Sequence, residues 1–324
     1  MTVKRRQNVL TTVDHSTIKQ QMKWEDLVHA FLRDVKARNL SPRTSESYEE
    51  SLKRLKLAFD EQKIPLDAFS ITTQDIKEYF VAYMIDQGKS SNTVNSRIKA
   101  CKAFFHYLYR EGWIKQNLAE ELHTVKSEKL MLQTFNKEQV AALLNQTERK
   151  TFTGYRDYTM MMVMFETGMR IGELMNLKIG DILFKEQEIR ITKGKGGRSR
   201  RVPIQKTCCK VLRKYLDIRG DLETDALFVS ITNSPLGSRT MQENMQEYGK
   251  KAGITGVRVS PHTFRHTMAK CYILNGGDAF TLQKILGHAT LDMVEYYLEL
   301  FSSDIKKQHQ KYSPVENMKL PSAL

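Results

Sequence analysis

The segment GMRIGEL at positions 168–174 places an arginine and a glutamate three residues apart. In a helix this spacing puts Arg170 and Glu173 on one face, where the guanidinium could stabilise developing negative charge and the carboxylate could orient it. An ion pair that only stabilises the fold explains the same spacing. From this segment alone, the structural ion pair is the preferred interpretation.

The segment SPHTFRH at positions 260–266 has the features of a helix start that could bind an anion. Ser260 is a natural N-cap, and proline suits the first helical position that follows it. His262 and Arg265 would then share a face near the helix amino terminus. Backbone N–H groups and the helix dipole favour negative charge there.

Lysine and tyrosine side chains occur in two further segments. Lys195 lies among glycines in TKGKGGRSRRVPI (192–204), at the tip of an expected hairpin, from which it could reach a groove or a leaving oxygen. In LGHATLDMVEYYLEL (286–300), His288 precedes the adjacent phenols of Tyr296 and Tyr297. A phenol can act as a nucleophile, although a tyrosine on an amphipathic helix often only places its hydroxyl in water.

We expect neither a metal site nor a nucleotide cofactor. His262 and His266 have the i, i+4 spacing of zinc helices, but Thr263 stands where a metalloprotease carries its glutamate. The glycines around Lys195 do not follow the order of an ATP-binding phosphate loop. The four cysteines form no C-x-x-C pair, which suits a reducing cytoplasm and argues against a cysteine-built zinc site.

Basic residues are concentrated in one part of the chain. The formal net charge is +14, and the stretch between Glu188 and Asp217 holds ten lysines and arginines with no acidic residue. A solvated surface is the ordinary explanation, but this density on a basic protein favours a polyanion, most simply nucleic acid. No apolar run approaches the roughly 20 residues of a membrane span, and the first residues lack a secretory signal's apolar core. We therefore expect a cytoplasmic protein with no membrane partner.

The elements that must position these residues fall into two expected domains. Residues 24–123 read as four amphipathic helices, the first with apolar residues at every fourth position. The second and fourth are expected to start at Ser41-Pro42 and Ser90-Ser91, and Thr73 is expected to cap the third. Residues 1–23 are expected to form a tail and residues 124–134 a linker. Four short-linked amphipathic helices indicate a small helical domain.

The second expected domain covers residues 135–324 and mixes helices with a few strands. Two apolar segments, EIRIT and RRVPI, look like strands on either side of the glycine-rich turn. The fold class is therefore mainly α, with a small antiparallel sheet in an α+β second domain. The expected elements are helices over 137–146 and within 155–177, strands at 188–192 and 200–204, a helix over 205–218, a short strand ALFVS at 226–230, and mostly helices beyond it.

Taken together, the segments resemble the tyrosine recombinase (phage integrase) family, in particular its Xer-like members. The family carries an arginine, a lysine, a His-x-x-Arg pair, a Leu-Gly-His triplet and a tyrosine in that order. The resemblance covers the second domain and extends to the helical first domain as a core-binding, SAM-like domain. The matching residues of this sequence are Arg170, Lys195, His262, Arg265, His288 and Tyr297, with Glu173 at the acidic position beside the first arginine.

The resemblance selects Tyr297 of the two tyrosines, because Xer-like members place the nucleophile nine residues after the histidine. Helix geometry supports the choice. At roughly 100° per residue, Tyr297 flanks an apolar stripe, whereas Tyr296 points nearly opposite its centre. The stripe consists of Leu291, Val294, Leu298 and Phe301.

The resemblance also implies a mechanism without ATP or a catalytic metal. Arg170 and Arg265 would clamp the phosphate through charge-assisted hydrogen bonds, and His262 and His288 would add donors or assist proton transfer. Lys195 would protonate the departing 5′-oxygen. Attack by Tyr297 would give a 3′-phosphotyrosyl bond that a 5′-hydroxyl from a partner duplex can reverse.

Partners and contacts follow from the same resemblance. The expected partner is double-stranded DNA with recombination sites, bound by a homotetramer. Strand exchange would proceed through a Holliday junction. The helix within 302–312 would dock on a neighbouring protomer. The protein is expected in the bacterial cytoplasm, associated with the nucleoid. Candidate DNA contacts are the basic residues Arg43, Lys89, Arg97, Lys99, Lys102, Arg198, Arg200 and Arg201.

Two alternatives to a site-specific recombinase are open. A type IB topoisomerase uses a similar residue set but nicks and reseals a single duplex, and a non-catalytic relative would only bind DNA. The setting is also open among integration, excision and resolution. A tail of about 23 residues is shorter than the arm-binding domain of many phage integrases. That leaves chromosome or plasmid resolution or, our preferred interpretation, movement of a mobile element.

Overall fold

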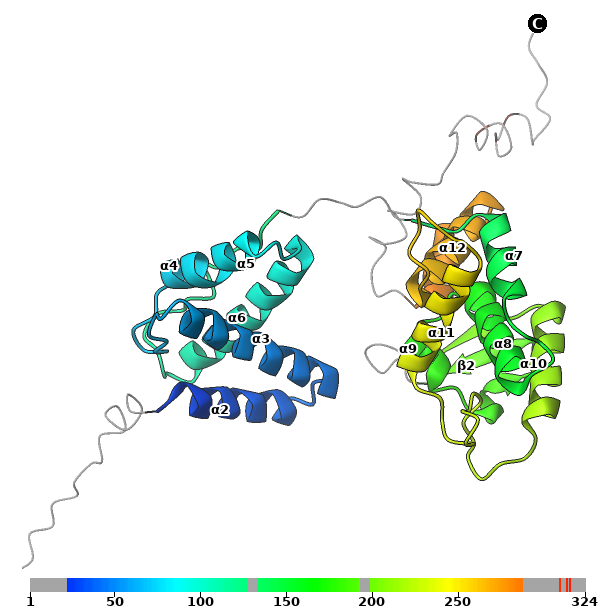
Figure 1. Cartoon of the computed structure of the whole chain (residues 1–324), viewed down its shortest axis with the longest axis horizontal. Coiled ribbons are helices and arrows are strands. Elements are labelled where there is room, and N and C mark those ends of the chain that lie inside the picture. Colours follow the sequence, from blue (N-terminus) through cyan, green and yellow to red (C-terminus); the bar gives the residue numbers. More distant parts are fainter. Residues whose placement is uncertain are drawn as a thin grey trace, which may run out of the picture. The chain divides into compact units, whose positions relative to one another are not determined.

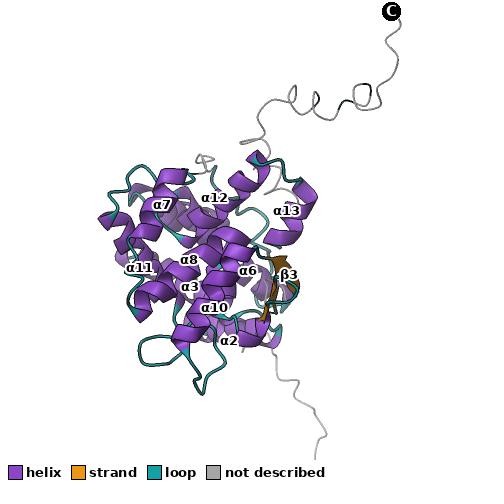
Figure 2. Cartoon of the chain, turned by 90° about the vertical axis from the view of Figure 1, so that its right-hand side faces the viewer, coloured by secondary structure: helices purple, strands orange, loops and turns teal. Residues whose placement is uncertain are grey.

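The structure, a computed structural model, describes residues 22–126, 133–192 and 199–287 and the single positions 309, 313 and 315. The chain divides into two compact units, residues 1–130 and residues 131–324. Figure 1 shows the two units, and each has its own hydrophobic core. Helices dominate both units (Figure 2). No helix within the described ranges is both long and apolar enough to cross a membrane.

The first unit is a bundle of helices whose starts are set by local side-chain caps. Ser41 and Ser90 each accept the backbone N–H of the residue three positions on, as expected. The expected cap at Thr73 is wrong by one residue, because Thr72 forms a reciprocal capping box with Asp75. The elements are α2 (Trp24–Ala37), α3 (Pro42–Glu61), α4 (Thr73–Ile76), the π-helical segment η1 (Lys77–Ala82), α5 (Tyr83–Asp86) and α6 (Ser91–Arg110).

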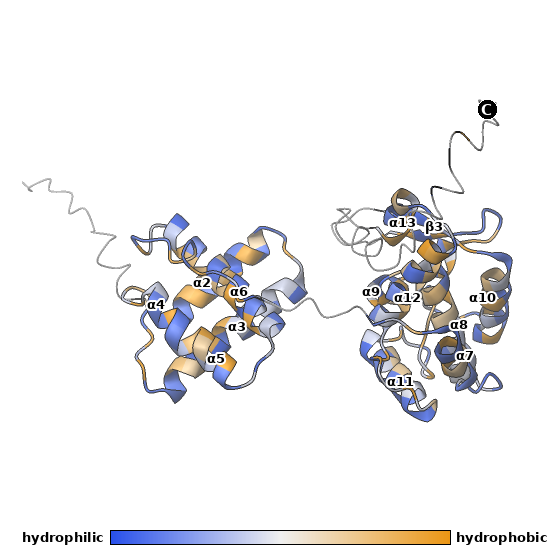
Figure 3. Ribbon diagram, turned by 90° about the horizontal axis from the view of Figure 1, so that it is seen from above, coloured by the Kyte–Doolittle hydropathy of each residue, from blue (hydrophilic) through white to orange (hydrophobic). Residues whose placement is uncertain are grey.

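Aromatic side chains fill the core of the first unit. The ring centroids of Phe31 and Phe104 lie 5.5 Å apart, and those of Trp24 and Phe104 lie 5.1 Å apart, both in edge-on arrangements. Edge-to-face pairs of this kind add to the free energy gained by burying the rings. The predicted apolar stripe of α2 is confirmed as part of this core. The helices of the two units carry both apolar and hydrophilic residues (Figure 3).

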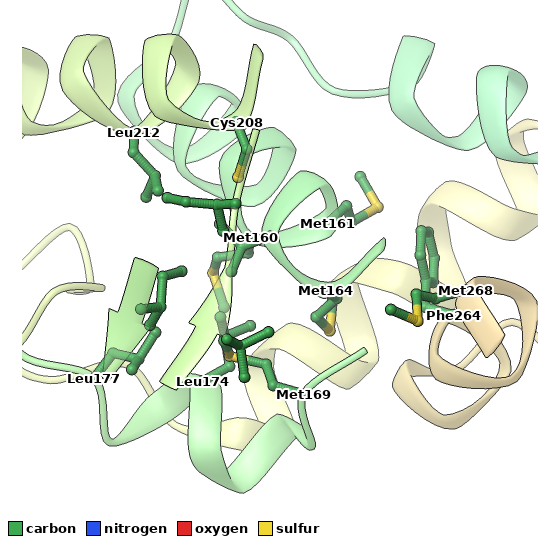
Figure 4. Packing of buried hydrophobic residues seen from close by; sticks show 14 of the residues in the cluster. Met160, Met161, Met164, Met169, Leu174, Leu177, Cys208, Leu212, Phe264 and Met268 are labelled. Atoms are coloured by element: carbon green, nitrogen blue, oxygen red, sulfur yellow. The ribbon is translucent and has the colours of Figure 1, made fainter. Parts of the chain in front are cut away.

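The second unit is built around the buried helix α8, which packs against both α10 and α12. Met160, Met161 and Met164 of α8 are buried among side chains from the flanking elements (Figure 4). The elements are α7 (Lys137–Asn145), α8 (Phe152–Thr167), α9 (Ile171–Met175), η2 (Ile179–Asp181), β1 (Ile182–Leu183), β2 (Glu188–Ile191), β3 (Arg200–Pro203), α10 (Lys206–Arg219), α11 (Ser238–Lys251), α12 (Pro261–Leu274) and α13 (Ala279–Leu286).

The described strands form one antiparallel sheet in the order β1-β2-β3. Ile189 pairs with Val202 and Ile191 with Arg200, which confirms the predicted hairpin. The expected strand ALFVS is wrong. Ala226 and Val229 make only isolated bridges to Lys178 and Pro235. The residues between them are all buried, so the apolar character of this segment reflects packing in the core.

Candidate active site

A glycine turn delivers Arg170 to the start of α9. Gly168 ends α8 in the left-handed conformation, with φ of 61°, and a Cβ there would lie 2.7 Å from Cδ2 of Leu286. Glycine is therefore required by both conformation and space. Arg170 follows as the residue immediately before α9, and its side chain is 28% exposed.

Glu173 holds Arg170 in this position through two hydrogen bonds. Its Oε2 accepts the backbone N–H of Arg170 at 2.9 Å, and its Oε1 accepts Nη1 of the guanidinium at 3.1 Å. The predicted proximity of the two residues is confirmed, although Arg170 caps the helix and does not lie within it. The Glu173 side chain is 4% exposed, so the carboxylate supports the arginine from inside the protein.

Arg200 on β3 completes the pairing of Glu173. Its Nη1 donates to Oε1 at 2.9 Å and its Nη2 donates to Oε2 at 2.8 Å, which is a two-pronged carboxylate–guanidinium pair. Burial of the carboxyl favours its neutral form, but the hydrogen bonds from Arg200 and from the backbone of Arg170 outweigh burial and lower the pKa of Glu173. The carboxylate is thus ionised between two guanidinium groups.

Arg265 lies deep beside this pair and joins two distant segments. The predicted start of its helix is confirmed, with Ser260 capping α12 and Pro261 at the first position. Nη1 of Arg265 donates to the Gly168 carbonyl at 2.6 Å, and Nη2 donates to the Leu286 carbonyl at 2.9 Å. One buried guanidinium therefore fixes the turn before Arg170 and the end of α13, two residues before His288.

The two histidines of α12 differ in exposure. His262 is exposed in the first turn, whereas His266 is half-buried one turn later. Burial, together with the nearby His262 and Arg265, lowers the pKa of His266 to about 4, so this imidazole is neutral at physiological pH. Among the described residues, no group of three or more His, Cys, Asp or Glu side chains is arranged to hold a metal ion.

A second glycine turn ends α13 just before the Leu-Gly-His histidine. Gly287 has φ of 64°, and a Cβ there would lie 2.8 Å from Nη1 of Arg200. The guanidinium thus packs directly against the backbone at this turn. Lys195, Arg198, His288 and Tyr297 lie outside the described residues, as does most of the expected helix within 302–312.

The candidate DNA contacts of the first unit separate into two groups. Arg43, Lys89 and Lys99 are exposed. Arg97 and Lys102 are only half-exposed and have internal partners, since Arg97 donates to the Ser51 hydroxyl at 3.0 Å and Lys102 to the Leu122 carbonyl at 2.9 Å. The side chains of the exposed group are accessible from solvent, as a phosphate contact requires.

Arg200 and Arg201 also differ in exposure. The Arg201 side chain is 61% exposed, whereas that of Arg200 is 13% exposed. The internal role of Arg200 escaped sequence reasoning, because the whole basic run was treated as one surface. The alternation of β3 held the missing signal, since Arg200 lies two residues from the buried Val202 and shares its face of the strand.

Comparison with known proteins identifies the family. Residues 133–303 match the model of the phage integrase family, and residues 28–112 match that of the phage integrase N-terminal SAM-like domain. This chain belongs to the phage integrase family, the tyrosine recombinases. It is a site-specific recombinase, an enzyme that breaks and rejoins DNA.

One relative and two solved structures show how similar this chain is to known proteins. Tyrosine recombinase XerD of Listeria monocytogenes is 29% identical over 296 residues, which cover 89% of this recombinase and 99% of XerD. The lambda integrase dimer bound to a COC′ core site superposes with a TM-score of 0.71 at 20% identity, covering 87% of this chain and 78% of that one. The Tn1549 transposon integrase with transposon right end DNA gives 0.71 at 16% identity, covering 91% and 99%. These structures share the fold.

Proposed function

We propose that Tyr297 of this recombinase attacks a DNA phosphodiester and forms a 3′-phosphotyrosyl bond, releasing a 5′-hydroxyl. Arg170 and Arg265 clamp the non-bridging oxygens of the phosphate as negative charge builds on them. His262 and His288 supply further donors to that phosphate or assist proton transfer. Lys195 protonates the leaving 5′-oxygen, and Glu173 orients Arg170 without reacting.

The observation that supports this proposal most is the pair of hydrogen bonds made by Arg265. Gly168 and Leu286 are far apart in the sequence, yet one guanidinium binds the carbonyl oxygens of both. The segment that carries Arg170 and the segment that continues to His288 are therefore held together. An anion close to Arg170 and Arg265 meets two fixed positive charges that need no reorganisation during the reaction.

A nicked suicide substrate tests the proposal, because loss of the short cleaved fragment prevents religation and traps the covalent protein–DNA adduct. We expect the adduct with the wild-type chain, unaffected by EDTA, and none with Tyr297→Phe. Tyr296→Phe is the matched control and should form the adduct normally. An adduct that persists in Tyr297→Phe and disappears in Tyr296→Phe contradicts the assignment.

The role of Lys195 has a separate test that uses the leaving group. A substrate with a bridging 5′-sulfur at the scissile phosphate releases a thiolate, which departs without protonation because its pKa is far below that of an alcohol. Lys195→Ala should therefore cleave this substrate far better than the natural one. Equal defects on both substrates contradict the general-acid role.

The proposed reaction couples two DNA sites in a homotetramer through a Holliday junction. A lambda integrase tetramer has been solved on such a junction, and XerH on palindromic difH in a post-cleavage complex. Strand exchange between two labelled duplexes that carry the mapped cleavage site tests this step. Relaxation of supercoiled DNA without any such site, in the absence of exchange, favours the topoisomerase alternative. That the recombinase moves a mobile element stays a prediction about its biological role.

The exposed basic residues of the first unit are proposed to contact DNA phosphates. Arg43, Lys89 and Lys99 are exposed. Such contacts fix the position of the protein on the duplex and carry no sequence information directly. Footprinting around the trapped cleavage site would show whether substitution of these residues shortens the protected region.

A further inference from the structure

Arg200 contacts two segments of the second unit besides its own strand. Its guanidinium binds Glu173 with both terminal nitrogens, and its Nε donates to the Ile285 carbonyl at 3.0 Å. The same group lies against the Gly287 backbone, where an added Cβ would be 2.8 to 3.0 Å from Nη1, Cζ and Nε of the guanidinium. Arg200 therefore joins β3, α9 and the carboxyl end of α13, which pack in one unit.

We propose that Arg200 is a positioning residue of the cleavage site and not a DNA contact. It fixes Arg170 through Glu173, and it fixes the turn at Gly287 from which the chain continues to His288. The proposal rests on the catalytic roles proposed above for Arg170 and His288. Because β3 also begins five residues after Lys195, one guanidinium connects the supports of three of the proposed catalytic groups.

The contacts of Arg200 require the planar guanidinium group, and a positive charge at this position would not be enough to form them. Three nitrogens of one planar group each donate a hydrogen bond, Nη1 and Nη2 to the Glu173 carboxylate and Nε to the Ile285 carbonyl. A lysine has a single nitrogen on a flexible stem and cannot reproduce this fork. Its charge would remain, but the link between Glu173 and α13 would be lost.

Arg200 also controls how much of Arg170 is available for the phosphate. In the described part of the chain, Arg170 is paired with the Glu173 side chain through Nη1 alone, at 3.1 Å. Arg200 supplies two shorter hydrogen bonds to the same carboxylate. If Arg200 is removed, the buried carboxylate has lost two of its donors and will draw the Arg170 guanidinium inward, away from DNA.

The test compares two neighbouring arginines of the same strand. Arg200→Lys and Arg200→Gln are measured beside Arg201→Gln, since Arg201 is exposed and ion-paired only loosely, with Glu188 at 3.5 Å. The measurements are the rate of adduct formation on the nicked substrate at saturating DNA and the DNA dissociation constant at several salt concentrations. Circular dichroism at the assay temperature gives the folded fraction, by which each rate is scaled.

For both Arg200 variants we expect adduct formation to fall about 100-fold, the scale of a misplaced catalytic group, with DNA affinity within about twofold of wild type. Lysine should not rescue glutamine. Arg201→Gln is compared only at saturating DNA, where the rate no longer depends on affinity, and there it should form the adduct at the wild-type rate. Arg200 variants that bind weakly, with a shallower salt dependence but normal cleavage at saturating DNA, overturn the proposal.

A pH profile separates positioning through Glu173 from a general structural role. Without the hydrogen bonds of Arg200, the pKa of Glu173 should rise, because burial then opposes ionisation with less compensation. Cleavage by Arg200→Gln should therefore fall as the pH is lowered, over a range in which the wild type is flat. Adding Glu173→Gln should remove this acid limb. A limb that persists in the double variant overturns the route through Glu173.

The double variant also covers the case in which Arg200→Gln folds poorly. Glu173→Gln with Arg200→Gln replaces a buried ion pair by two amides that can bond to each other. The two substitutions should be non-additive, so that the double variant cleaves faster than the product of the single defects predicts. Strict additivity overturns the coupling. No adduct with the wild type would instead refute the proposed function itself.

Discussion

The two units of this recombinase differ in that the second contains buried ion pairs besides exposed ones. In the first unit the ion pairs lie at the surface, as in Arg54 and Glu50, whose side chains are 56% and 46% exposed. In the second unit Arg156 and Asp157 pair at 4% and 1% exposure, and Glu173 is buried between two arginines. Surface pairs contribute little to stability, whereas buried charges must be fully paired. Two cations of the second unit, Arg156 and Arg200, therefore organise the protein interior.

The buried network around Asp157 shows what this difference means for packing. Asp157 accepts Nε of Arg156 at 2.8 Å on one oxygen, and the Asn244 amide and the Tyr248 hydroxyl, each at 2.8 Å, on the other. Arg156 also donates to the Val229 carbonyl at 3.1 Å. The network fastens α11 and the segment around Val229 to the central helix α8.

The largest effect, on the rate of adduct formation, is expected from substitution of the buried Arg265 in the second unit. Arg265→Ala removes the guanidinium charge that would stabilise the phosphate, and it leaves the Gly168 and Leu286 carbonyls without this donor. Adduct formation at saturating DNA should therefore fall by about 100- to 1,000-fold. DNA binding should weaken much less, because it rests mainly on phosphate contacts elsewhere. Equal losses of binding and cleavage would contradict the clamp.

The next largest effect is on stability, because removing an ion pair should cost more unfolding free energy in the second unit than in the first. Asp157→Ala leaves the Arg156 guanidinium buried without its carboxylate and should cost about 3–5 kcal/mol of unfolding free energy. Glu50→Ala removes an exposed pair in the first unit and should cost less than about 1 kcal/mol. Denaturant titration followed by circular dichroism measures both. Similar costs would erase the contrast between buried and exposed pairs.

In the second unit, His266 should make a pH-dependent contribution to stability. His266 has a folded-state pKa of about 4, below its ordinary value, so the unfolded chain binds the proton more readily. Stability from this group is therefore present above the unfolded-state pKa and is lost as the pH falls toward 4. His266→Gln should flatten that part of the melting-temperature profile. A profile unchanged by the substitution contradicts the depressed pKa.

The smallest effect is expected from the exposed cations of the first unit. Arg43→Ala and Lys99→Ala should each reduce the slope of log affinity against log salt by about 0.9 if the residue contacts one phosphate. Cleavage at saturating DNA should not change. Lys102→Ala is the matched control, since Lys102 donates to the Leu122 carbonyl, and its salt slope should stay at the wild-type value.

Local chemistry explains which parts of the fold could be predicted. The caps at Ser41, Ser90 and Ser260 were predicted because each depends on a hydrogen bond within three residues. The cap at Thr72 was missed by one position because two adjacent threonines have the same intrinsic capacity, and the position of Asp75 decides between them. The segment ALFVS was misassigned because an apolar run does not reveal whether a partner strand exists.

The sequence by itself determined the order of the chemical groups, the antiparallel hairpin and the helix that presents His262 and Arg265. These features depend on residue type and short spacing, which the chain carries wherever it folds. Only the tertiary structure decided that Arg200 faces Glu173 and Ile285 and that Arg265 joins Gly168 to Leu286. Those contacts connect residues 21 to 97 positions apart, and only the packing of α8, α12, α13 and β3 brings such distant groups within a hydrogen bond.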